Sequence, residues 1–331
     1  MASPGGPLAA LLQPSLSLAD AVNSGNVGIS YAGGGFLVLY FLGVSKTLQQ
    51  LGIARPGSVR TAGASVGALV QLADHPGSWP HDEYAARVGE LFDLCRSERN
   101  CIQTLDARVA QFAAPLFDRV WAGANGRACV AISLADEGPE AKGASTCSFS
   151  GPADFLSAAR AACYVPGWSG PEAALPFRGR KALDGALTQQ NPCPPGVAYC
   201  IKVAVLTPWD VARSIEGMPA SLPRTAGLLT DIAAKAIGPD PVGFAAALVS
   251  RVASPRSDGV AQAQFDLQRF LPSGKIIADI YPGKYSKSPL TPAQLILLAF
   301  VPADADTRRT LYEMGQADAR AWAREQGWPG A

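Results

Sequence analysis

The sequence predicts an α/β protein with a mostly parallel central sheet flanked by helices. Apolar, β-branched runs end at glycines, and amphipathic segments with helical spacing follow them. The run 26–32 (NVGISYA) ends at three glycines, and the apolar side chains of residues 36–53 then recur on one helical face. A second short strand, a sharp turn and a second helix follow, which is the order typical of parallel strands joined by crossover helices.

The later segments continue this alternation. We expect helices over residues 66–74, 81–98, 105–121, 151–165, 291–300 and 304–326, with two more helical stretches between 207 and 270. We expect the remaining strands over residues 59–65, 127–136, 181–185, 199–207 and 274–283. Without an internal repeat or a long linker, the sequence predicts a flexible N-terminal arm (1–25) and a single domain (26–326).

Composition excludes several classes of function. The chain of 331 residues has a net charge of +1, so no bulk charge indicates nucleic-acid binding. The sequence contains no run of 18 uncharged apolar residues, so it predicts no transmembrane helix. The seven cysteines include no CxxC pair and no zinc-ligand spacing, which favours buried thiols in a reducing compartment over a disulfide framework. Cys193 and Cys200 are the pair for which a disulfide stays open.

The segment GASVG (63–67) holds a serine in a G-x-S-x-G motif. Small flanking residues let the backbone turn sharply between a strand and a helix, so that the Ser65 hydroxyl stands clear of the sheet. In that position the next N–H group and the helix N-terminus face a developing oxyanion. The motif alone is weak, and an ordinary glycine-rich turn is the alternative.

The second motif is the glycine loop formed by Gly33, Gly34 and Gly35. Consecutive glycines at a strand-to-helix junction let several N–H groups converge on one anion. That anion is either a phosphate or the oxyanion of an acyl intermediate, unless the glycines are only structural. Val38 stands where a dinucleotide motif needs its third glycine, and no P-loop lysine is present, so phosphate is disfavoured.

The interpretation of Ser65 as a nucleophile depends on which residue accepts its proton. A usual Ser-His-Asp hydrolase needs a histidine far downstream, but the chain has only His75 and His81. We expect both to be surface or capping residues, which leaves a carboxylate or a lysine. The best carboxylate is Asp184 in GRKALDGAL, at a strand end beside Gly185. Burial would raise its pKa towards that of an effective base.

Three ordered segments resemble the patatin-like phospholipase and acyl-hydrolase family, in the branch of the adipose-type triacylglycerol lipases. They are the glycine block ISYAGGGFLVLYFLGV (29–44), the serine segment GASVGAL (63–69), and FLSAARAACYVPGW…PFRGRKALDGALTQQNP (155–168 and 176–192). The resemblance runs from about residue 27 to about residue 322. It departs from the family at Val38 and Ala186, where glycines are common, and in lacking a basic residue just after the glycine block.

The resemblance implies a patatin-like three-layer fold and a Ser-Asp dyad. Ser65 would be the nucleophile, Asp184 the base, and the N–H groups of residues 33–35 the oxyanion hole, with the Val66 N–H as a helper. No metal or cofactor is expected. The implied reaction releases fatty acid from glycerolipids, triacylglycerol or phospholipid, through an acyl-enzyme.

The implied setting is a lipid surface. We expect a cytoplasmic protein bound peripherally to a membrane or lipid droplet, with residues 168–177 and 226–253 as candidate contacts and protein partners unknown. The alternatives are a lipid acyltransferase or transacylase, and a catalytically silent lipid-binding scaffold. A third alternative, a nucleotide-binding protein, is disfavoured because the phosphate-binding motifs are absent.

Overall fold

A seven-stranded mixed sheet forms the centre of the molecule in the computed structural model, which describes residues 16–98, 101–136, 141–206 and 278–331. The path through the sheet is β5-β6-β3-β2-β1-β7, and β4 also pairs with β3. The strands are β1 (Val27–Tyr31), β2 (Arg60–Ala64), β3 (Ala128–Leu134), β4 (Lys142–Thr146), β5 (Leu175–Phe177), β6 (Arg180–Leu183) and β7 (Tyr199–Val203).

The sheet has a parallel half and an antiparallel half. β7, β1, β2 and β3 pair in parallel, with Ile29 of β1 opposite Thr61 of β2 and Ile201 of β7. β4 and β6 both pair antiparallel with β3, and β5 pairs antiparallel with β6. The α/β class is therefore as predicted, but only three of the six strand pairings are parallel.

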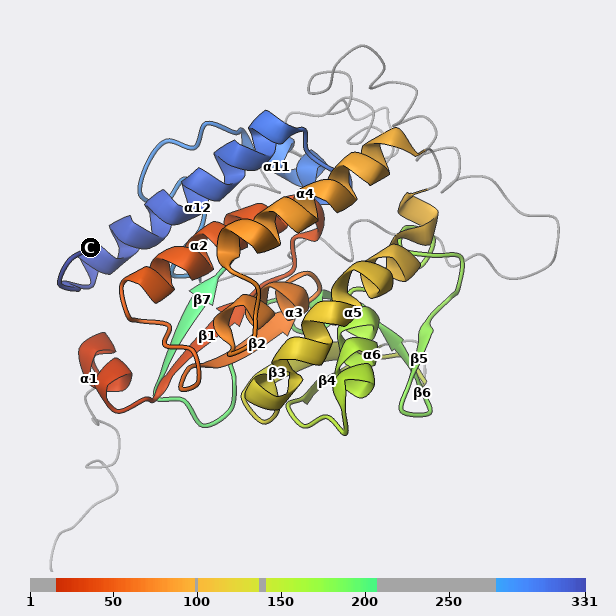
Figure 1. The fold of residues 1–331 in the computed structure, drawn as a ribbon, viewed down its shortest axis with the longest axis horizontal. Helices are drawn as coiled ribbons and strands as arrows, with labels where there is room; N and C mark the ends of the chain where they lie inside the picture. The colour runs from red at the N-terminus through yellow and green to blue at the C-terminus, as the bar shows by residue number, and fades with distance from the viewer. Residues whose placement is uncertain (1–15, 99–100, 137–140, 207–277) are drawn as a thin grey trace, which may run out of the picture.

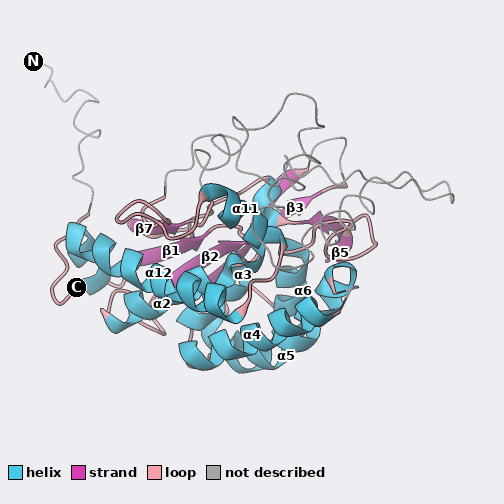
Figure 2. Ribbon diagram, turned by 90° about the horizontal axis from the view of Figure 1, so that it is seen from above, coloured by secondary structure: helices cyan, strands magenta, loops and turns pink. Residues whose placement is uncertain are grey.

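Helices form a layer against one face of this sheet (Figures 1 and 2). The longer ones are α2 (Val38–Gln50), α4 (His81–Ser97), α5 (Leu105–Ala124), α6 (Pro152–Ala162), α11 (Pro292–Phe300) and α12 (Ala305–Glu325). The shorter ones are α1 (Leu18–Asn23), η2 (Gly35–Leu37), α3 (Gly67–Val70), η3 (Gln71–Asp74), η4 (Ile102–Thr104) and η5 (Gly185–Leu187). None of these described helices is long and apolar enough to cross a membrane.

The helix α2 packs along α12 in this layer (Figure 1). Its apolar side chains are buried on nearly all sides, which explains why the periodicity of its sequence is weak. A Cβ at Gly43 would lie 2.1 Å from the Tyr312 carbonyl oxygen, and one at Gly315 would lie 2.0 Å from that of Tyr40. Glycine at both positions thus allows the backbones of α2 and α12 to approach closely.

Some expected elements differ from the structure. Leu18, Ala21 and Val22 of α1 are buried, so residues 18–23 are not part of a flexible arm. The helix expected over 66–74 divides into α3 and the 3₁₀ helix η3. Within 278–283 the expected late strand makes only an isolated bridge from Ile280 to Val203. The helical stretches expected between 207 and 270, including the candidate lipid contact 226–253, lie outside the described residues.

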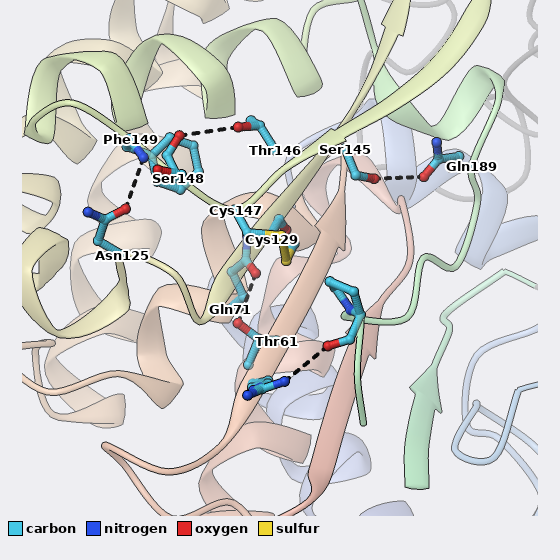
Figure 3. Close-up of a disulfide and its surroundings, with 12 residues drawn as sticks. Thr61, Gln71, Asn125, Cys129, Ser145, Thr146, Cys147, Ser148, Phe149 and Gln189 are labelled. Atoms are coloured by element: carbon cyan, nitrogen blue, oxygen red, sulfur yellow. Dashed lines mark hydrogen bonds between the residues drawn. A yellow bond between two sulfur atoms is a disulfide. The ribbon is translucent and has the colours of Figure 1, made fainter. Parts of the chain in front are cut away.

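The expectation of unpaired thiols is wrong for Cys95, Cys101, Cys129 and Cys147, and the pair for which a disulfide stayed open, Cys193 and Cys200, is bonded. The structure pairs Cys95 with Cys101, Cys129 with Cys147, and Cys193 with Cys200, and leaves Cys163 free. Figure 3 shows the second pair, which ties β3 to the chain just after β4. The sequence spacing did not reveal this second pair, because strand pairing in the sheet brings residues 129 and 147 together.

Candidate active site

Ser65 lies on a sharp turn between the end of β2 and the start of α3. Its φ of +53° is in the left-handed region, which non-glycine residues rarely adopt. A Cβ at Gly63 would lie 2.2 Å from the Gly67 carbonyl, and one at Gly67 would lie 2.3 Å from the Tyr31 carbonyl oxygen. The two glycines of the motif therefore permit the tight turn, and the strained serine conformation is the one expected of a nucleophile elbow.

Asp184 lies between β6 and η5, and its backbone is anchored on both sides. Its N–H donates to the Tyr164 carbonyl at 2.9 Å, and its own carbonyl accepts from the Ser133 hydroxyl at 2.7 Å. A Cβ on Gly185 would lie only 2.0 Å from the Ala131 carbonyl oxygen. The glycine after the aspartate is thus needed for close approach to β3, and that approach fixes where the carboxyl group lies.

The side chains of Ser65 and Asp184 meet. The Asp184 carboxyl group is 2% exposed, interacts with the Ser65 hydroxyl, and accepts a hydrogen bond from the Ala186 N–H at 2.8 Å. Burial raises the pKa of Asp184 to about 7, although the nearby Ser65 hydroxyl and the Ala186 N–H oppose this increase. A carboxyl group with that pKa is matched to proton transfer at neutral pH.

The glycine loop lies beside this pair. A Cβ on Gly33 would be 3.2 Å from the Ser65 Cβ and 2.9 Å from the Ala186 Cβ. Gly35 has a φ of +54°, and a side chain there would collide with the Ala299 carbonyl oxygen at 1.9 Å. The backbone N–H groups of residues 33–35 and of Val66 have no acceptor among the described residues. Residues 33–35 line a cavity together with Ser65, and Val66 follows Ser65 directly, so these N–H groups are candidate donors to an oxyanion there.

The two histidines belong to other networks. His75 is buried, its Nε2 lies 2.8 Å from the Thr61 hydroxyl, and it is the C-cap residue of η3, so it is a capping residue and not a surface one. Burial lowers its pKa to about 3. His81 begins α4, and its Nε2 lies 2.8 Å from the Ser45 hydroxyl. Neither histidine contacts Ser65 or Asp184 in the described hydrogen bonds.

Two cavities meet at Ser65. The larger, about 730 Å³ including its mouth, lies between α4 and α5. The smaller, about 470 Å³, is lined by the glycine loop, Asp184 and Gln190. Gly35, Ser65 and Trp168 line both cavities. The serine hydroxyl is thus accessible from two chemically different sides.

Sequence reasoning missed several residues of this site. Trp168 separates the two cavities and contacts the rings of Phe36 and Phe300 at 5.5 and 5.9 Å. Its indole N–H is buried and has no hydrogen-bond partner among the described residues. Trp168 was expected in a surface loop that contacts lipid, but it is 7% exposed. No local signal identifies it or Phe300 of α11, because only long-range packing brings them to Ser65.

The comparisons with known proteins identify no relative. No protein-family model matches the chain, and a search of curated proteins finds no match. Function is therefore inferred from the chemistry and geometry of this site.

Proposed function

We propose that the protein is a serine-dependent carboxylic ester hydrolase that acts on lipids. The observation that carries the proposal is the contact of Ser65, on a strained strand-to-helix turn, with a buried carboxyl group whose pKa is about 7. Support comes from the unpaired N–H donors beside it and from the two cavities that meet there. The three segments that resemble the patatin-like family contain these same residues.

The proposed mechanism uses each group in the geometry described above. Asp184 accepts the Ser65 proton as the hydroxyl oxygen attacks the ester carbonyl carbon. The N–H groups of residues 33–35, helped by that of Val66, stabilise the oxyanion. Collapse of the intermediate breaks the ester C–O bond, and Asp184 returns the proton to the leaving alcohol. Water then attacks the acyl-enzyme by the same proton transfers and releases the fatty acid.

The substrate class in this proposal is a glycerolipid, triacylglycerol or phospholipid, met at a membrane or lipid-droplet surface. The apolar side chains of the larger cavity suit an acyl substrate. A patatin-like three-layer arrangement with a mostly parallel sheet is the finer fold proposed from the resemblance. Three disulfides favour an oxidising compartment, so the proposal keeps peripheral association with lipid but no longer favours the cytoplasm.

The proposal is tested by Ser65→Ala and Asp184→Asn, with hydrolysis of p-nitrophenyl esters and then of a lipid panel as the readout. Both substitutions should abolish hydrolysis, whereas Asp318→Asn, which removes a carboxyl group bonded to Tyr40, should not. Full activity in Ser65→Ala would refute the dyad. Parental protein that binds vesicles but hydrolyses no ester indicates the scaffold instead. Transfer of the acyl group to added glycerol in place of water indicates a transacylase.

The Asp184→Asn variant also separates loss of chemistry from loss of fold. The raised pKa means that the folded state binds a proton more tightly than the unfolded state between about pH 4 and 7, so this group's stabilising contribution falls as pH rises through that window. Asparagine removes the cost of a buried charge. The variant should therefore be inactive yet more stable than the parent at pH 8, by on the order of a few kcal/mol, and urea unfolding at pH 5 and 8 measures this.

A further inference from the structure

The two cavities at Ser65 differ in the groups that they offer a substrate. Asp184 and two of the glycines, Gly33 and Gly34, line only the smaller cavity. The larger cavity is lined mainly by apolar side chains of α4 and α5, among them Val88, Phe92, Val109 and Phe112. An ester has two parts, an acyl chain and an alcohol, and each must lie on one side of the serine.

The proton transfers determine which of the two cavities holds the alcohol of the ester and which holds its acyl chain. In the proposed mechanism the leaving alcohol takes its proton from Asp184, and the attacking water gives its proton to Asp184. Both must therefore reach the carboxyl group from the smaller cavity, the only one of the two that it lines. The acyl chain stays bonded to Ser65 while alcohol leaves and water enters, so it must occupy the other side. Resting on the proposed function, we infer that the larger cavity binds the acyl chain and sets the chain length that the enzyme accepts.

The charged residues that line the larger cavity are compatible with an uncharged acyl chain as its ligand. Asp106 and Arg160 are the charged groups among the described residues that line it, and they form a two-pronged ion pair at 3.0 and 2.5 Å. Because each neutralises the other, the wall offers no net charge to an anionic head group. An apolar chain buried here gains from the hydrophobic effect along its length.

Leu69 of α3, Tyr84 of α4 and Phe112 of α5 line one part of the cavity. The Tyr84 hydroxyl donates to the Leu69 carbonyl at 3.0 Å, and Tyr84 and Phe112 both contact the Trp79 ring. Leu69 lies about one turn of helix, roughly 6 Å, beyond Ser65. Phe112 therefore lines the cavity next to the Trp79–Tyr84 pair, and Val109 lies about one turn before it on α5.

The experiment changes the cavity without touching the dyad. Val109→Phe should lower kcat/KM for long-chain p-nitrophenyl esters by about tenfold or more, and leave the acetate ester nearly unaffected, because added bulk excludes terminal methylenes. Phe112→Ala should move the preferred length towards longer chains. Leu94→Phe, which adds the ring on the exposed face of α4, is the matched control and should keep the parental profile. A parental ratio of long-chain to acetate kcat/KM in Val109→Phe overturns the inference.

A binding measurement distinguishes failure of this inference from failure of the proposed function. A dansyl-labelled fatty acid is titrated into Ser65→Ala and into Ser65→Ala/Val109→Phe, with melting curves to show that both are folded. The second substitution should weaken binding by about tenfold. This result would support the acyl cavity even if the parental protein hydrolyses no ester. Equal affinity of the two variants would overturn the acyl cavity even if hydrolysis depends on Ser65.

Discussion

The two halves of the sheet contribute to the candidate site in different ways. In the parallel half, β1 and β2 lead directly into the glycine loop and into Ser65, and β1 is buried along its whole length. In the antiparallel half, β4 is largely exposed, and β6 delivers Asp184 through its pairing with β3. The nucleophile and the oxyanion donors thus depend on local turns, whereas the base depends on strand pairing between distant segments.

The largest expected effect comes from breaking the contact that positions Asp184 from the antiparallel half. Gly185→Ala forces a Cβ to within 2.0 Å of the Ala131 carbonyl oxygen, so the carboxyl group must move. A displacement of about 1 Å at a reacting group costs on the order of a hundredfold in rate, and we expect at least that loss in kcat/KM.

The matched control for this change is Gly151→Ala. Gly151 has an extended φ of 175°, and no atom lies within 4 Å of an added Cβ, so activity and melting temperature should stay near the parental values. Parental activity in Gly185→Ala would contradict the view that packing against β3 positions the base.

The next largest effect concerns the disulfide that connects the two halves. Removing Cys129–Cys147, whose residues are 18 apart, should lower the free energy of unfolding by about 3 kcal/mol. Removing Cys193–Cys200, with a separation of 7, should cost about 2 kcal/mol. Urea unfolding of the paired serine variants, each with both cysteines replaced, measures the two values.

A thiol titration of the denatured, unreduced protein checks the pairing itself. One thiol, that of Cys163, should react before reduction, and all seven after it. Seven reactive thiols without a reductant would restore the expectation from the sequence that the cysteines are unpaired.

The smallest expected effect is the pH dependence of kcat/KM, which tests the contact of Ser65, from the parallel half, with Asp184, from the antiparallel half. Because Asp184 must be ionised to accept the Ser65 proton and its pKa is about 7, kcat/KM should fall about tenfold for each pH unit below 7. Asp318 has a pKa raised to about 6 by burial, so Asp318→Asn tests whether another carboxyl group causes the fall. The profile of that variant should match the parent. A rate independent of pH down to 5 would exclude Asp184 as the base.

The halves also differ in how far the sequence predicted their strands, although β6 of the antiparallel half was predicted too, over residues 181–185. β1, β2, β3 and β7 carry short apolar runs that end near glycine or polar residues, and each was predicted close to its observed bounds. β4 (KGAST) is short, polar and mostly exposed, so neither alternation nor an apolar run marks it. β5 has three residues, one of them Pro176, and shows no strand pattern.

The sequence by itself determined the turns of this protein. The glycines around Ser65 and in residues 33–35 specify backbone geometries that few other residues allow, and the late position of Asp184 beside Gly185 marks a second tight approach. Because those constraints act within a few residues, a short sequence motif is enough to recognise them.

Only the tertiary structure decided how those turns meet. The pairing of β6 with β3 brings the carboxyl group to Ser65, and burial there raises its pKa to about 7. The space that α4 and α5 leave between them and the position of Trp168 create two cavities that share Ser65. Burial, cavity shape and the Cys129–Cys147 disulfide depend on contacts between residues that are not neighbours in the chain, which no local pattern encodes.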